Sequence, residues 1–324
     1  MVKFNYKKTF SGNLIIGLLI TIGLIISSCE KTVFFEVDTQ ENRLVVNSFI
    51  QPDTTVNLSV SLSTDPLAVG FDKVRVNNAT VKIFRNNVFL GNFDYLNDGN
   101  YSFDPVLLNA SPGNNFQIEV SAPGKETVSA ETTIPSSVLI EKVIITDTVF
   151  VVVQYSSFDS LGNYYVIDTV VPHYELQVTF TDPAGEDFYS LKVNYVDAYS
   201  ESYTCFTTDD PVFTVGDYNF GTESQSGVIT LCDEVIFTDI TFEGQQKTIT
   251  LSLLELPTEF ILDPKFVFRL NHLSEDYYKY IASSTLQVSN GDNPFAEPVI
   301  VYSNINNGFG ILAGLTSAFA EVEL

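Results

Sequence analysis

Val56-Asn57-Leu58-Ser59-Val60-Ser61-Leu62 decides the fold class of this chain. Apolar and polar residues alternate strictly over these seven positions, which predicts a β-strand with one face in a core and the other in water. The same two-residue period recurs along the first half of the chain, in the ranges 44–50, 80–84, 88–94, 116–120 and 127–134. We therefore expect an all-β protein.

Turn signals separate these runs. Asn97-Asp98-Gly99-Asn100 and Ser111-Pro112-Gly113-Asn114 contain Gly and Asn, which tolerate the positive φ of tight turns. About seven short strands in roughly 95 residues fit a β-sandwich of immunoglobulin-like or prealbumin-like type. We place this sandwich at residues 43–135 and a domain boundary at Pro135, because proline cannot donate to a strand ladder.

Residues 136–324 are expected to form a larger, mostly antiparallel β domain with one short helix. The helix is predicted over 273–281, with Ser274 as N-cap and with Leu273 and Tyr278 at the spacing of a hydrophobic staple. We expect it to cover an open end of the β core; a tyrosine-lined ligand platform is the alternative. Strand patterns occupy 140–155, 164–171, 174–181, 188–196, 228–231, 247–254 and 265–271.

The N-terminus has the order of a secretion signal. Three lysines precede an uncharged apolar run over 14–26, and two serines then precede Cys29. As a helix this run would reach about 20 Å, against roughly 30 Å for a bilayer core. The order resembles a bacterial lipobox, so we predict a lipoprotein signal peptide at 1–28, a covalent lipid on Cys29 and a tether over 29–42. An uncleaved anchor helix and an ordinary cleaved signal are the alternatives.

The charge of the chain excludes nucleic acid as a partner. Three of the 16 basic residues and none of the 40 acids lie in the predicted signal, so the rest carries 13 minus 40, or −27. Such a surface repels nucleic acid and anionic lipid headgroups. Beyond Cys29 the chain has two cysteines, Cys205 and Cys232, which could form one disulfide or remain two buried thiols.

Catalytic and metal-binding motifs have little support, and we expect no enzyme and no cofactor. His173 and His272 lie outside any H-E-x-x-H or Cys/His pattern, so no zinc site is predicted. Gly308, Gly310 and Gly314 lack the dinucleotide-binding spacing and are expected to permit a bend between strands.

Acidic residues offer two further possibilities. The pairs Glu186-Asp187, Asp209-Asp210 and Asp233-Glu234 could serve a glycosidase, but among 40 acids such pairs are expected in solvated loops. The loops Asp94–Asp98 and Asp209–Asp217 could bind calcium through their oxygen atoms, although neither loop matches the spacing of an EF-hand.

Several segments together resemble the envelope lipoproteins of Bacteroidota grouped as domain of unknown function 4249. They are Cys29-Glu30-Lys31, Leu44-Val45-Val46-Asn47, the stretch from Ala122 to Pro135, Asn293 to Pro298, and Tyr302 to Ile311. The resemblance implies that the protein is an outer-membrane lipoprotein and that its gene lies beside the gene of a TonB-dependent receptor. It carries over no functional residue, because the family defines none.

We therefore expect a lipid-anchored outer-membrane lipoprotein that acts as a non-catalytic binding or assembly accessory of a TonB-dependent transporter. Its partners would be the membrane lipid and that receptor, and the membrane face that displays it is left open. A surface protein that binds or hydrolyses glycans, and a structural cell-surface adhesin, are the alternatives.

Overall fold

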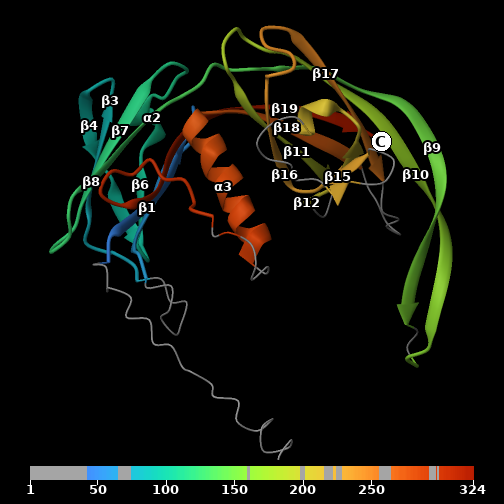
Figure 1. Cartoon of the computed structure of the whole chain (residues 1–324), viewed down its shortest axis with the longest axis horizontal. Coiled ribbons are helices and arrows are strands. Elements are labelled where there is room, and N and C mark those ends of the chain that lie inside the picture. Colours follow the sequence, from blue (N-terminus) through green and yellow to red (C-terminus); the bar gives the residue numbers. More distant parts are fainter. Residues whose placement is uncertain are drawn as a thin grey trace, which may run out of the picture. The chain divides into compact units, whose positions relative to one another are not determined.

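The computed structural model is mostly β (Figure 1). Residues Asn42–Leu324 form one compact unit. The predicted signal peptide, Cys29 and all but the last residue of the predicted tether lie outside the described residues. The structure describes residues 42–64, 74–158, 161–197, 201–214, 222–223, 228–254, 264–291, 297 and 299–324. The expected all-β, sandwich-like class is confirmed.

The largest sheet has nine strands. Eight follow the order β12-β11-β18-β19-β1-β2-β6-β5, and β16 pairs with β11 beside this path. All of these pairs are antiparallel except β1 with β19. The strands are β1 (Leu44–Ile50), β2 (Val56–Leu62), β5 (Asp94–Asn97), β6 (Asn100–Phe103), β11 (Phe188–Val196), β12 (Glu201–Tyr203), β16 (Glu234–Thr238), β18 (Lys265–Leu273) and β19 (Phe309–Glu323).

A four-stranded sheet provides the second layer of the N-terminal sandwich. Its order is β4-β3-β7-β8, with β3 (Thr80–Arg85), β4 (Val88–Asn92), β7 (Asn115–Ser121) and β8 (Val128–Thr133). One face of each layer alternates into a shared core, in which Val46 and Val60 meet Ile83 and Phe116. Each of these four side chains is fully buried, as the two-residue period predicts.

A six-stranded sheet forms the second layer of the C-terminal half. Its order is β14-β15-β13-β17-β10-β9, with β9 (Ile140–Phe158), β10 (Tyr164–Thr181), β13 (Phe206–Thr208), β14 (Thr222–Glu223), β15 (Ile229–Leu231) and β17 (Gln246–Leu254). Val178 and Leu251 from this sheet share a second core with Leu191 and Phe268 from the nine-stranded sheet. The chain thus builds two cores against one long sheet.

Strand β19 links the two halves. It pairs in parallel with β1 at one edge and antiparallel with β18 at the other. Leu312 belongs to the first core, whereas Val322 packs against the second. Apart from β19 and Ile305, which belongs to the first core, the two clusters separate close to Pro135. The division into domains at 43–135 and 136–324 stays a prediction.

The main helix is longer than predicted. It is α3 (Glu275–Gly291), so the predicted start after Ser274 agrees with the structure and the predicted end at residue 281 is ten residues short. Leu273 and Tyr278 share one buried cluster with Ala282, Ile236 of β16 and Leu315 of β19. In the second half of the helix, the hydroxyls of Ser283 and Ser289 donate hydrogen bonds to backbone carbonyls four residues earlier. Serine weakens a helix signal in sequence because its hydroxyl competes for backbone groups.

Two short turns complete the described helical structure. They are α2 (Pro105–Leu108) and the 3₁₀ turn η1 (Pro211–Phe213), capped by the side chains of Asp104 and Asp210 respectively. Within the described residues, none of the helices combines the length and the apolar character that crossing a membrane requires.

Two predictions about the strands are wrong. Residues 164–171 and 174–181 belong to one strand, β10, because Pro172 lies where β9 is the only partner and pairing with β17 begins at His173. Gly310 and Gly314 do not separate two strands but lie within β19. Each instead permits close backbone approach, since a Cβ on Gly314 would lie 2.5 Å from a neighbouring carbonyl oxygen.

Candidate functional site

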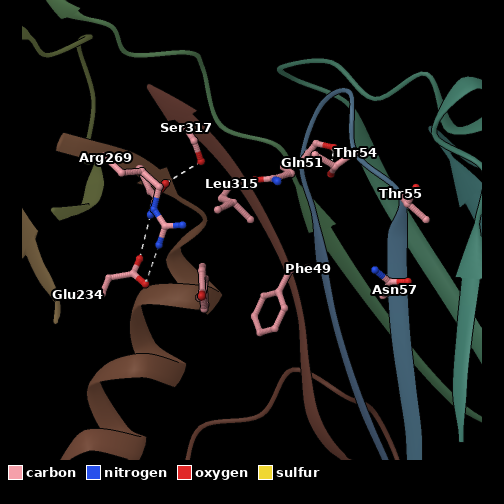
Figure 2. A pocket seen from close by; sticks show the side chains of 11 residues that line it. Phe49, Gln51, Thr54, Thr55, Asn57, Glu234, Arg269, Leu315 and Ser317 are labelled. Atoms are coloured by element: carbon pink, nitrogen blue, oxygen red, sulfur yellow. Dashed lines mark hydrogen bonds and ion pairs between the residues drawn. The ribbon is translucent and has the colours of Figure 1, made fainter. Parts of the chain in front are cut away.

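A pocket of about 280 Å³ lies beside α3, on the face of the nine-stranded sheet opposite the first core (Figure 2). Strand alternation places it there: even-numbered residues of β1 enter the core, so Phe49 points to the other side. The volume is at the lower edge of the range typical of ligand pockets. Its lining comes from six elements and one turn: Phe49, Gln51, Thr54, Thr55, Asn57, Glu234, Arg269, Asn271, Tyr277, Leu315 and Ser317.

One wall of the pocket is a network of polar side chains centred on Glu234. Its carboxylate lies 3.4 Å from Nη2 of Arg269 and accepts hydrogen bonds from Ser190 (2.5 Å) and Asn271 (2.9 Å). Ser317 donates to Oδ1 of Asn271 at 2.6 Å. Because its oxygens already have these partners, Glu234 holds Arg269 in place and is not poised as a free acid or base.

The opposite wall is aromatic. The rings of Phe49 and Tyr277 lie 4.9 Å apart between centroids, and α3 supplies the tyrosine. Burial, followed by the negative charge of Glu234, raises the pKa of Tyr277 to about 12, so its hydroxyl remains a neutral donor.

Arg269 is the only cationic residue in the lining of this pocket. Its Nε is buried and has no hydrogen-bond partner among the described residues, but the side chain as a whole is 36% exposed. A carbonyl, hydroxyl or carboxylate oxygen of a bound molecule could accept a hydrogen bond from the exposed part of the guanidinium, while an apolar ring or chain contacts Phe49 and Tyr277. The arrangement can bind a small amphipathic molecule.

A second feature is the end of the β9–β10 hairpin, residues 149–172, which we call the arm (Figure 1). Its register is regular, and cross-strand pairs such as Val152 with Val170 and Phe158 with Tyr164 lie on one face. Six large apolar residues on this face are 48 to 69% exposed: Phe150, Val152, Phe158, Tyr164, Val166 and Val170. We call these six the apolar face of the arm.

The edges of the arm are also open among the described strands. β9 is the last strand of its sheet, and β10 gains its second partner, β17, only from His173 onward. The 24 residues of the arm include no lysine or arginine. Apolar side chains and unpaired strand edges together are typical of a surface that another protein covers.

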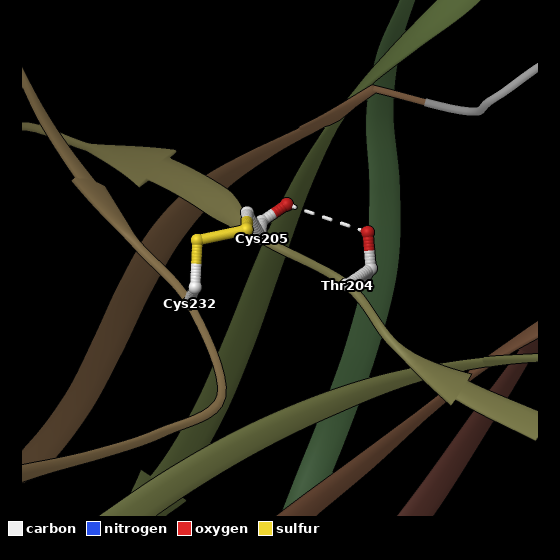
Figure 3. Close-up of a disulfide and its surroundings, with 3 residues drawn as sticks. All are labelled: Thr204, Cys205 and Cys232. Carbon is white, nitrogen blue, oxygen red and sulfur yellow. Dashed lines mark hydrogen bonds between the residues drawn. A yellow bond between two sulfur atoms is a disulfide. The ribbon is translucent and has the colours of Figure 1, made fainter.

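The two cysteines beyond the predicted lipidation site are joined. Cys205 and Cys232 form a disulfide with 1.97 Å between the sulfurs (Figure 3). They flank the pairing of β13 with β15, in which Phe206 lies opposite Leu231. Of the two states that the sequence left open, the structure contains the bond, and its place beside buried strands indicates a stabilising role.

The acidic pairs have partners of their own. Asp210 caps η1 and lies 2.7 Å from Lys247, and Asp233 lies 3.3 Å from Lys192. Asp187 contacts His272, with 2.7 Å between Oδ1 and Nε2. Three of the acidic residues that the sequence analysis expected in solvated loops therefore make structural contacts.

The predicted calcium loops are only partly described. Asp98 lies 3.6 Å from Nε of Arg75, and Asp94 begins β5. The second loop, Asp209–Asp217, ends outside the described residues.

His173 lies in β10 opposite Val149, and His272 lies in β18, so the two histidines belong to different sheets.

Sequence reasoning missed most of the pocket. Of its lining, only Glu234 and Tyr277 lie in segments for which the sequence suggested a possible functional role; the others lie in predicted strands or outside the named segments. One signal was available: Arg269 and Asn271 are a charged and an amide residue within a strand whose alternate positions are Phe268 and Leu270. Such residues in mid-strand can face either solvent or a site, and only the tertiary structure distinguishes the two.

Comparisons with known proteins identify a family but no activity. A family model described as "Domain of unknown function (DUF4249)" matches residues 30–319. No curated protein matches the chain. A solved structure of a DUF4785 family protein from Legionella pneumophila is similar with 12% identity and a TM-score of 0.22, over 70% of this chain and 52% of that chain. This chain spans about half the length of that protein, and the likeness carries no argument here.

Proposed function

Since this chain belongs to the family described as domain of unknown function DUF4249, we propose that it is a lipid-anchored outer-membrane lipoprotein and a non-catalytic binding or assembly accessory of a TonB-dependent transporter. The order of residues before Cys29 supports the anchor. The arm supports the accessory role, and it is the observation that carries the proposal.

The arm favours a partner because its exposed surface is otherwise unfavourable. The six residues of its apolar face leave hydrocarbon in water, at about 25 cal/mol for each Å² that a partner could bury. A folded chain gains nothing from this exposure, whereas a bound partner would remove it. Large exposed apolar patches on soluble proteins mark such sites.

Charge favours a protein over a bilayer surface as this partner. Segments that bind at the headgroup level combine apolar residues with Lys or Arg, and the arm has neither of these cations. The chain without its predicted signal carries −27, which repels anionic lipid. A transporter domain with an apolar groove or a free strand edge would satisfy both the side chains and the open backbone of the arm.

Shortening the arm tests the proposal. Residues 152–170 are replaced by Asn-Gly, which joins Val151 to Val171, a pair already in register, through a two-residue hairpin turn. We expect detergent-solubilised membranes to yield a TonB-dependent transporter with the intact protein, and at least tenfold less with the shortened one. Mass spectrometry of the intact protein should find an acylated Cys29 as its first residue.

A matched control removes apolar surface elsewhere. Val88→Thr with Leu96→Thr changes two exposed apolar residues of the N-terminal half, which are 63 and 53% exposed. This variant should recover the transporter like the unmodified protein. Equal recovery by the shortened protein would refute the docking role of the arm.

Glycan binding is the second candidate, and the pocket beside α3 favours it. An aromatic pair facing amide, hydroxyl and guanidinium groups suits a sugar ring, which has an apolar face and a polar edge. Hydrolysis would need two carboxylates across the sugar, whereas the lining residues include one, Glu234. Calorimetric titration with mono- and oligosaccharides should show binding that Phe49→Ala abolishes; the absence of heat with every sugar would remove this candidate.

A further inference from the structure

Three aspartates from different parts of the chain converge at the ends of three strands. Asp182 follows β10, Asp187 precedes β11 and Asp239 follows β16. One carboxylate oxygen from each lies within 4.8 Å of the others. Asp182 and Asp239 are each 3% exposed, so their carboxylates are removed from water. We call these three residues the buried acidic cluster.

The neighbours of the buried acidic cluster compensate only part of its charge. Asp182 accepts hydrogen bonds from the Tyr189 hydroxyl and from the backbone N–H of Gly244. His272 contacts Asp187 through Nε2, and its Nδ1 lies 2.8 Å from a backbone carbonyl. Both ring nitrogens thus face oxygens, so this ring can supply at most one positive charge to three carboxylates.

Asp239 offers an unused acceptor. Among the described residues its buried Oδ2 has no hydrogen-bond partner, in contrast to the bonded oxygens of Asp182 and Asp187. Buried polar atoms in folded proteins nearly always have a partner, and an unpaired one requires an explanation such as an ion.

We propose that Asp182, Asp187 and Asp239 bind a calcium ion. Oxygen ligands at roughly 2.4 Å from Ca²⁺ lie up to about 4.8 Å apart across the ion, which the separations in the cluster permit. Mg²⁺ needs shorter distances, of about 2.1 Å, and retains most of its water. Zinc is disfavoured because the cluster has no cysteine and the near nitrogen of His272 is engaged with Asp187.

A neighbouring pocket offers the ion further ligands. It has a volume of about 400 Å³, and Asp187 and His272 line it together with Glu186 and Glu275. Water in this pocket can complete a coordination shell of six to eight oxygens. The site is distinct from the two loops in which the sequence suggested calcium, and from the pocket beside α3.

Terbium luminescence and thermal unfolding test the site on the full chain. The chain has no tryptophan, and Tyr189 contacts Asp182, so excitation of tyrosine should sensitise Tb³⁺ bound at the cluster. Calcium should displace Tb³⁺ and quench this emission. It should also raise the unfolding temperature by several degrees relative to a chelator. No sensitised emission and no calcium-dependent shift would overturn the proposal.

Asp239→Asn distinguishes a calcium site from a cluster that is merely protonated. In chelator this variant should unfold at the same temperature as the unmodified protein or higher, because the amide removes an unpaired buried charge. In calcium it should show at least tenfold weaker binding and no gain in unfolding temperature. Asp98→Asn, a change at an exposed ion pair, should retain the full calcium response. A full response in Asp239→Asn would refute the site, since the response would then arise elsewhere.

Discussion

Replacing Gly310 by alanine should disrupt the parallel pairing of β1 with β19. Gly310 has φ +107° and lies opposite Val46 in the parallel ladder. A Cβ at this position would lie 2.0 Å from the Val46 carbonyl oxygen and 2.8 Å from its carbon. Ordinary contacts of this kind exceed about 3.4 Å, and both atoms belong to backbone, so the two strands would have to separate.

The expected cost combines two contributions. The positive φ alone destabilises a residue with a Cβ by about 1–2 kcal/mol. Separation of the strands removes ladder hydrogen bonds beside the fully buried Val46, and each backbone group left unpaired there costs about 1–3 kcal/mol. We therefore expect Gly310→Ala to lower the free energy of unfolding by about 3–5 kcal/mol.

Gly113→Ala is the matched control. Gly113 has φ +80°, but a Cβ there would meet no atom within 4 Å, so its substitution isolates the conformational cost at about 1–2 kcal/mol. Denaturation in urea, followed by far-ultraviolet circular dichroism, measures both variants. The steric account is wrong if Gly310→Ala is no more than 1 kcal/mol less stable than Gly113→Ala.

Three further predictions concern bonds within the cores. Replacing Cys205 and Cys232 by serine should lower the free energy of unfolding by about 3.5 kcal/mol, because the disulfide closes a loop with a sequence separation of 27; urea denaturation with and without reductant checks this. Tyr101→Phe should cost about 1–3 kcal/mol in the same assay, since the buried hydroxyl donates to one backbone carbonyl and accepts from one N–H. In chelator, the free energy of unfolding should fall by about 2.5 kcal/mol between pH 4 and pH 7: Asp239 has a folded pKa of about 6 against 3.8 unfolded, so the folded state holds the proton more tightly and loses this advantage as the pH rises. A flat pH profile would contradict the last of these.

Strands with one buried face could be predicted from sequence to the residue. β1, β2 and β11 begin and end as expected, because alternation marks each position as inside or outside. β19 could not be predicted in this way. Six consecutive residues, 311–316, are buried in it, so both faces are covered and no alternation is left to detect.

The site was less accessible to sequence reasoning than the fold. Phe49, Glu234 and Arg269 come together only because β1 and β18 both pair with β19, and that pairing is long-range. The buried acidic cluster depends in the same way on β10, β11 and β16. Local pattern identifies strands, but it does not identify which strands become neighbours.

Site-specific photo-crosslinking in intact cells tests the proposed docking role of the arm most directly. A photoreactive residue replaces Val152 on the apolar face, and a second protein carries it at Val88, which is similarly exposed but lies in the N-terminal half. Our account predicts that Val152 yields a covalent adduct with a TonB-dependent transporter and that Val88 does not. An adduct from Val88 alone, or none from Val152 with the protein folded and membrane-bound, would contradict it.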